Sequence, residues 1–134
     1  MLAWDRVTME WFFEAKASDG MSEVAAEVFA WLSAFQWAKK NNWDDFALIS
    51  DSSIVLKAFS NDRSPSWKCI SWFAAATKLK HSFSNVSLFH FNRTYLAFVD
   101  SLAKSARYSE SETLCCKGEG FPPVDPIFSV AILR

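Results

Sequence analysis

The chain has 134 residues, of which 51% are hydrophobic and 16% aromatic, and its formal net charge is −1. No apolar run is long enough to cross a bilayer, and a charge this close to zero does not predict a strong nonspecific grip on phosphates. The three cysteines favour a reducing compartment, and the first residues lack the features of a signal peptide. We therefore expect one soluble domain without a membrane segment, located in the cytoplasm or nucleus and not secreted.

The first part of the chain predicts a hairpin, a helix and a strand. Apolar residues 2–4, a polar turn at Asp5 and Arg6, and the alternating residues 11–17 indicate two antiparallel strands. Ser22 is a suitable N-cap for a helix that extends to about residue 43. The continuous apolar run at residues 46–49 is typical of a strand in a parallel sheet.

The second part continues the alternation of helices and strands. Polar residues 51–53 open a short helix, Ser66 caps another that ends near His81, residues 86–91 predict a strand, and residues 94–107 predict a helix. The pattern predicts an α/β fold, with a mixed sheet made of an N-terminal antiparallel hairpin plus parallel strands, and with flanking helices. We expect a domain over residues 1–107 and a tail over 108–134, mostly irregular, with a terminal strand as one option.

Three carboxylates occupy positions where the local sequence pattern predicts an apolar residue. Glu27 falls inside the apolar stripe of the first helix, Asp51 closes an apolar strand, and Asp100 interrupts the apolar face of the last predicted helix. Because buried carboxylates are costly unless they are paired or bound to metal, we interpret the three as one acidic site. The structural alternatives are a Lys or Arg partner for Glu27, a helix N-cap role for Asp51, and an i,i+4 pair of Asp100 with Lys104.

Three motifs in this order resemble those of plant ribonuclease H-like domains, including domains related to retrotransposon reverse transcriptases. They are Ala-Glu at residues 26–27, Ser-Asp-Ser at residues 50–52, and Asp-Ser-Leu-Ala-Lys at residues 100–104. The similarity covers about residues 1–107. It implies a ribonuclease H-like sheet and RNA–DNA hybrid ribonuclease activity.

The resemblance also implies a cofactor, ligands and a partner. Glu27, Asp51 and Asp100 would act as the catalytic carboxylates and hold two Mg²⁺ ions roughly 4 Å apart. The substrate would be an RNA–DNA hybrid, recognised by its backbone shape and 2′-hydroxyls. His90 and Arg93 match a His and an Arg of the family, but a strand-end histidine and a solvated arginine explain them equally well.

The family's first strand, whose Asp bridges both metal ions, has no counterpart before residue 2. Asp5 is the one early acidic candidate, and its position suits a turn. We therefore expect an N-terminally truncated, catalytically impaired domain that binds Mg²⁺ weakly or not at all and is a monomer. The alternative is a noncatalytic scaffold or interaction remnant derived from a retrotransposon.

The loss of a central strand would leave a gap in the sheet, with unpaired backbone groups. Either the strand at residues 46–49 pairs directly with residues 2–5, or residues 127–133 enter the sheet. At the end of the helix after Ser66, Lys78, Lys80 and His81 are interpreted as favourable charges at a helix C-terminus rather than as phosphate ligands.

Overall fold

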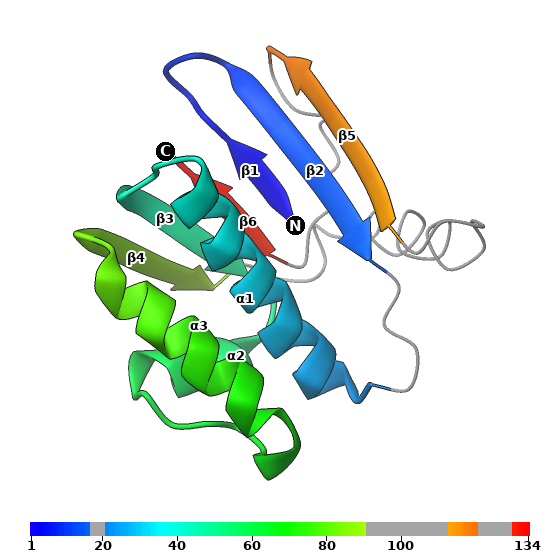
Figure 1. Ribbon diagram of the computed structural model, residues 1–134, viewed down its shortest axis with the longest axis vertical. Helices are drawn as coiled ribbons and strands as arrows, with labels where there is room; N and C mark the ends of the chain where they lie inside the picture. Colours follow the sequence, from blue (N-terminus) through cyan, green and yellow to red (C-terminus); the bar gives the residue numbers. More distant parts are fainter. Residues whose placement is uncertain (17–20, 91–112, 121–129) are drawn as a thin grey trace.

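A computed structural model of the chain describes residues 1–16, 21–90, 113–120 and 130–134. Figure 1 shows a twisted six-stranded sheet in the order β4-β3-β6-β1-β2-β5. The strands are β1 (Leu2–Trp4), β2 (Glu10–Lys16), β3 (Asp45–Ser50), β4 (Asn85–His90), β5 (Thr113–Glu119) and β6 (Val130–Leu133). β1 and β2 form the predicted antiparallel hairpin, and β3 and β4 are parallel. The expected mixed sheet is confirmed.

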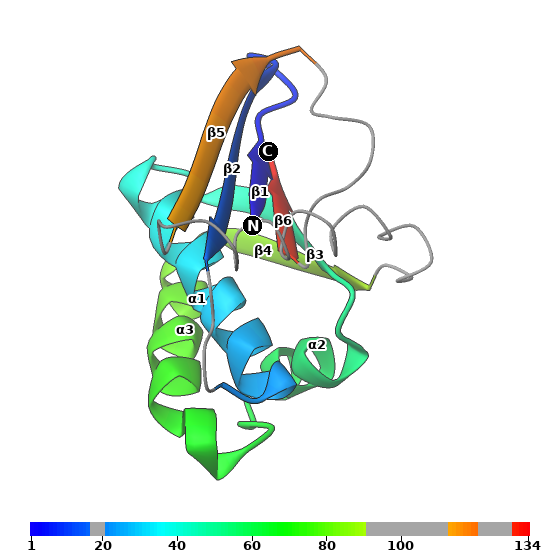
Figure 2. The same cartoon turned by 90° about the vertical axis from the view of Figure 1, so that its right-hand side faces the viewer.

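The described helices lie on one face of this sheet (Figure 2). They are α1 (Glu23–Lys40), α2 (Ser53–Ser60) and α3 (Ile70–Ser82), and α3 is entered through a short 3-10 turn at Trp67–Cys69. Ser22 caps α1 by accepting a hydrogen bond from Ala25 N, as predicted, and Ser66 caps the 3-10 turn. The predicted helix at residues 94–107 lies outside the described residues. No helix in the described part of the chain is long and apolar enough to span a membrane.

Aromatic side chains fill the space between α1, the sheet and the other two helices. Trp31 and Phe35 of α1 are fully buried, and Phe59 of α2 stacks on Trp31 with ring centroids 4.4 Å apart. Leu48 of β3 and Ile132 of β6 supply the floor of this core from the sheet. Such large rings bury much apolar area, so α1 is fixed firmly against the strands.

β6 lies between β1 and β3, where the sequence analysis expected a gap. Its residues pair in parallel with β1, where Leu2 faces Ala131, and in antiparallel with β3, where Leu48 faces Ile132. Of the two options, entry of residues 127–133 into the sheet is confirmed for Val130–Leu133, whereas residues 127–129 lie outside the described residues. The alternative of direct pairing between β1 and β3 is wrong. The physical reason is that β6 satisfies the facing backbone edges of both strands and buries three apolar side chains.

Part of the expected tail forms a second strand that the sequence analysis did not anticipate. β5 pairs with β2 over seven residues, and Gly118 lies under the ring of Trp11. A Cβ at position 118 would lie 2.5 Å from Trp11 Cζ2, so only glycine admits the ring there. β5 and β6 both fall in the predicted tail, and both belong to the sheet that begins at residue 2. The division of the chain at residue 107 stays a prediction.

Candidate active site at the end of β3

The C-terminal end of β3 is organised by the hydroxyl of Ser50, which is completely buried. Its Oγ donates a hydrogen bond to Glu27 Oε1 at 3.0 Å and accepts one from Trp31 Nε1 at 3.3 Å. It also accepts from Ser52 N at 3.1 Å, which fixes the turn out of the strand. Glu27 is half-buried. The Ser50 hydroxyl therefore links the Glu27 side chain on α1 to the end of β3, which is followed by Asp51.

Asp51 is half-buried at the start of the turn between β3 and α2. It does not cap α2: the N-cap is Ser52, whose side chain accepts from Val55 N. The alternative interpretation of Asp51 as an N-cap is therefore wrong. The same turn approaches β4, because His90 pairs with Ser50 in the sheet and its Nε2 lies 3.3 Å from the carbonyl oxygen of Asp51.

Only some residues of the predicted site belong to the described part of the chain. Asp100 and Arg93 lie outside the described residues. Within the residues that are described, no group of three or more His, Cys, Asp or Glu side chains is arranged to hold a metal ion. β6, the strand now at the centre of the sheet, carries Val, Ala, Ile and Leu and contributes no carboxylate between residues 130 and 133. Glu27 and Asp51 offer oxygen ligands of the kind that Mg²⁺ prefers, but a site that binds Mg²⁺ tightly needs more ligands than these two.

Asp5 serves the hairpin turn and not this site. Its Oδ1 accepts from Val7 N at 2.9 Å, and its Oδ2 accepts from Arg134 Nε at 3.2 Å. Burial alone would raise the pKa of Asp5, but the hydrogen bonds from Arg134, Val7 and Thr8 outweigh it and hold that pKa below its usual value. The turn interpretation accounts for this residue.

The charged end of α3 has structural partners. Lys80 Nζ donates to the carbonyl oxygen of Phe59 at 2.6 Å and lies 3.3 Å from Asp62 Oδ1, and His81 Nε2 lies 3.1 Å from Asp62 Oδ2. Burial alone would raise the pKa of Asp62, but Lys80 and His81 outweigh it and lower that pKa. These contacts join the end of α2 to the end of α3, which supports the structural interpretation of Lys80 and His81.

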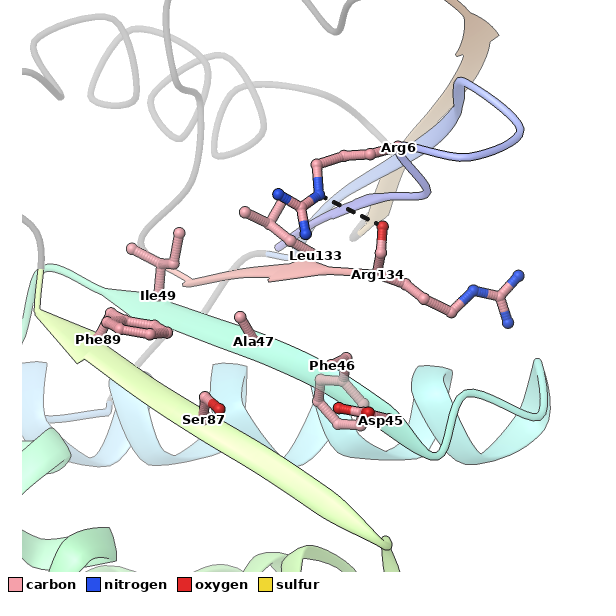
Figure 3. A pocket seen from close by; sticks show the side chains of 9 residues that line it. All are labelled: Arg6, Asp45, Phe46, Ala47, Ile49, Ser87, Phe89, Leu133 and Arg134. Carbon is pink, nitrogen blue, oxygen red and sulfur yellow. Dashed lines mark hydrogen bonds between the residues drawn. The ribbon is translucent and has the colours of Figure 1, made fainter.

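A separate open pocket of about 540 Å³ lies on the face of the sheet away from α1 (Figure 3). Ala47, Ile49, Phe89 and Leu133 form its apolar wall, and Arg6 and Arg134 lie at one end. Neither Glu27 nor Asp51 lines it. The pocket therefore plays no part in the acidic site.

Glu27 and Asp51 were predicted from the sequence as site residues, and this assignment stays a prediction, whereas the contacts that hold Glu27 at the end of β3 were not predicted. Ser50 and Trp31 are identified only by their contacts, although Ser50 does begin the Ser-Asp-Ser motif. The net charge of the whole chain also gives no sign that positive charge is concentrated in residues 52–90. Residues 52–90 contain five Lys or Arg and one Asp, a formal charge of +4, whereas the whole chain has −1.

A mixed six-stranded sheet with helices packed on one face is the arrangement of a ribonuclease H-like fold. A family model described as reverse transcriptase-like matches residues 5–106, and the chain belongs to this family. Ribonuclease H-like proteins generally use Mg²⁺ and bind nucleic acid hybrids. No curated protein and no solved structure matches the chain.

Proposed function

We propose that the chain is a nucleic-acid-binding domain of the RNA–DNA hybrid ribonuclease type whose hydrolytic activity is impaired. The observation that carries the proposal is the hydrogen bond from Ser50 to Glu27, because it joins an acidic helix residue to the strand end that continues into Asp51. In the proposal, Glu27, Asp51 and Asp100 are the catalytic and metal-binding carboxylates. Bound Mg²⁺ would supply an activated water and neutralise charge on the phosphate.

The impairment is supported by the composition of the central strand. The family's bridging carboxylate belongs to a central strand, and β6 holds the central position with apolar side chains. With one ligand fewer, metal affinity falls because each carboxylate contributes charge and a coordinate bond. A retrotransposon origin is part of the same proposal.

Binding to a polyanion is supported by the basic segment 52–90. Lys57, Arg63, Lys68 and Lys78 are exposed, and Trp67, next to Lys68, is 78% exposed. Segments of this composition attract phosphates over several ångströms, and an exposed ring offers a surface on which an unpaired base stacks. The acidic excess of the chain lies outside this segment.

The test uses a labelled RNA–DNA hybrid, with cleavage measured at millimolar Mg²⁺ or Mn²⁺. We expect slow cleavage that Asp51→Asn and Glu27→Gln abolish. Asp45→Asn is the matched control, because Asp45 is an exposed carboxylate at the opposite end of the same strand, and it should leave cleavage unchanged. Equal activity of Asp51→Asn and the wild type would refute the assigned ligands, and no cleavage by any variant would identify the noncatalytic remnant.

Binding is tested separately by fluorescence anisotropy at several salt concentrations. Replacing Lys57 and Lys68 by Gln should weaken hybrid binding and reduce the slope of log K against log salt by about 2, since each phosphate contact contributes about one. The control replaces the exposed Lys40 and Lys117, which changes net charge equally on other elements. Equal effects of the two double variants would show that segment 52–90 is not the binding surface.

A further inference from the structure

The solvent-facing surface at the start of α3 is apolar, whereas the exposed face of a helix in a globular protein is typically charged or polar. The exposed residues in its first two turns are Ile70, Ser71, Ala74 and Ala75. Trp67, in the 3-10 turn that leads into α3, lies at the N-terminal end of this stripe and is 78% exposed. Ile70, three residues later, is 59% exposed, so the two large apolar side chains are neighbours on one surface. Exposed apolar patches of this kind mark binding sites.

The turn that carries Trp67 is held in place by hydrogen bonds to Ser66. The Ser66 side chain accepts from Lys68 N at 3.3 Å, and the Ser66 carbonyl oxygen accepts from Cys69 N at 3.4 Å. The same carbonyl oxygen accepts from Ser64 Oγ at 2.7 Å. Cys69 is completely buried, which anchors the turn on the core. An aromatic side chain on a fixed turn loses little conformational freedom when a ligand covers it, so the turn is preorganised for binding.

The charge around this ring is positive. Residues 63–90 contain four Lys or Arg and no Asp or Glu. Asp62, the acid that precedes this stretch, is paired with Lys80 and His81. Lys68 Nζ lies 6.0 Å from the centroid of the Trp67 ring. The surroundings of the ring therefore complement a polyanion.

The position of the ring in its patch favours a nucleic acid over a protein as the occupant. Aromatic anchors of protein interfaces lie near the centre of the interface, surrounded by residues that exclude water. Trp67 lies at the end of its stripe, beside Lys68, and the stripe continues with small side chains. An exposed ring beside a cation is the arrangement with which single-stranded nucleic acids are bound, by stacking of a base and contact with its phosphate.

α3 and α1 are neighbours that run in the same direction (Figure 1). Near their beginnings, the rings of Phe29 and Trp72 lie 5.3 Å apart, and near their ends Lys39 Nζ donates to Ser82 Oγ at 3.3 Å. The N-terminal parts of both helices are therefore at the same end of the molecule.

This end of the molecule also carries the acidic residue of α1. Glu27 precedes Phe29 by two residues, and Trp67 precedes Trp72 by five. A rise of about 1.5 Å per residue, a distance of about 8–10 Å between helix axes, and side chains that face β3 and solvent respectively separate Glu27 from Trp67 by roughly 15–20 Å. A nucleic acid strand bound at the proposed acidic site reaches the ring after a few further nucleotides.

We propose that Trp67 is a stacking subsite for an unpaired base, so that the preferred ligand is an RNA–DNA hybrid with a single-stranded extension of a few nucleotides. The base must be unpaired, because bases inside a duplex are covered on both faces by their neighbours. Lys68 contacts the phosphate beside the stacked base. This inference rests on the proposed function, since it extends the binding of the same hybrid beyond the acidic site.

The test compares a labelled blunt RNA–DNA hybrid with the same hybrid carrying about six unpaired nucleotides on either the DNA or the RNA strand. Binding to the full chain is measured by fluorescence anisotropy in a chelator, so that no cleavage occurs. We expect the wild type to bind an extended hybrid about tenfold more tightly than the blunt hybrid, and Trp67→Ala to bind both equally. Because the lost contact carries no charge, the tenfold difference should persist as the salt concentration rises.

Two variants separate stacking from a general loss of apolar surface. Trp67→Phe keeps a ring and should retain most of the preference for the extended hybrid. Ile70→Ala is the matched control, since it shortens the neighbouring exposed apolar side chain and should leave the preference unchanged. All three substitutions alter exposed side chains, so urea unfolding should show folded variants of similar stability.

The outcomes distinguish this inference from the proposed function. Equal affinity of the wild type for blunt and extended hybrids would overturn the stacking subsite and leave hybrid binding intact. Absence of binding to any of the hybrids would refute the proposed function and the subsite together. A change in the sedimentation of Trp67→Ala, without a change in its preference for extended hybrids, would identify a protein-docking surface and would also overturn the subsite.

Discussion

Replacement of Ile132 by alanine measures how far β6 contributes to the core. Ile132 is fully buried and lies opposite Leu48 on the helix side of the sheet. The substitution removes three carbon atoms, worth about 2.4 kcal/mol of transfer free energy at roughly 0.8 kcal/mol each. Because the strands on both sides hold the space open, a cavity term adds to this, and we expect a total loss of about 3–4 kcal/mol in the free energy of unfolding.

The matched control is Leu133→Ala, one residue further along the same strand. Leu133 faces the opposite side of the sheet, where it lines an open pocket and is half-buried (Figure 3). Its removal leaves no closed cavity, so we expect a loss of about 1 kcal/mol. The difference between the two variants isolates the side of β6 that faces α1.

Urea unfolding followed by tryptophan fluorescence gives both values, because Trp31 and Trp43 are buried in the same core. The measurement is made at low protein concentration, and an unchanged m-value shows that the same surface is exposed on unfolding. A loss below about 1 kcal/mol for Ile132→Ala, or equal losses for the two variants, would refute the placement of β6 between β1 and β3.

Two further substitutions test the elements that flank β6. Because the fold lowers the pKa of Asp5, the stabilisation it brings is fully present above its ordinary pKa of 3.8 and is lost as the pH falls through the lowered value. Asp5→Asn should therefore be less stable than the wild type at neutral pH, with a difference that narrows towards pH 3 in urea titrations, and a constant difference would contradict this. Gly118→Ala should destabilise the chain by about 1–3 kcal/mol, because the new methyl group meets the Trp11 ring, and unchanged stability with unchanged Trp11 fluorescence would contradict that contact.

The elements that the sequence predicted are those whose signals are local. The Ser22 cap and the apolar stripe of α1 act within one helix, and the alternation in β2 belongs to one strand. β5 was not predicted because its residues do not alternate between polar and apolar and include a glycine, and it is formed by pairing with β2, about a hundred residues earlier. The position of β6 remained one of two options, since four apolar residues identify a buried strand but not its neighbours.

The residues of the candidate site also divide into those that have a local signal in the sequence and those that do not. Glu27 is a candidate from the sequence because a charge inside an apolar helical stripe conflicts with the local pattern, and Asp51 is one because it closes a buried strand; their role in a site stays a prediction. The role of Ser50 could not be predicted from the sequence, because a serine after an apolar run has many structural explanations. Its three hydrogen-bond partners come from α1 and from the turn after β3, and only the tertiary structure brings them together.

The position of β6 in the sheet also indicates where a carboxylate could be added to the proposed acidic site. Val130 pairs with Ser50 and is fully buried in the core on the helix side, so its side chain belongs to the same face as the hydroxyl that binds Glu27. We expect Val130→Asp to be several kcal/mol less stable than the wild type without metal, because it buries an additional charge. With Mn²⁺ or Mg²⁺ at roughly one hundred times Kd, binding at the new carboxylate and its neighbours should return about 2.7 kcal/mol.

Val130→Asn is the control for that substitution, since it has nearly the same shape and polarity but no charge. It should be destabilised and should not respond to metal, as measured by the thermal midpoint with and without chelator. The comparison separates a ligand effect from a packing effect, because only the carboxylate adds a coordinate bond to the end of β3. An equal metal response from Val130→Asp and Val130→Asn would mean that the central strand does not reach the acidic site, and the proposed impairment would then need a cause other than the apolar residues of β6.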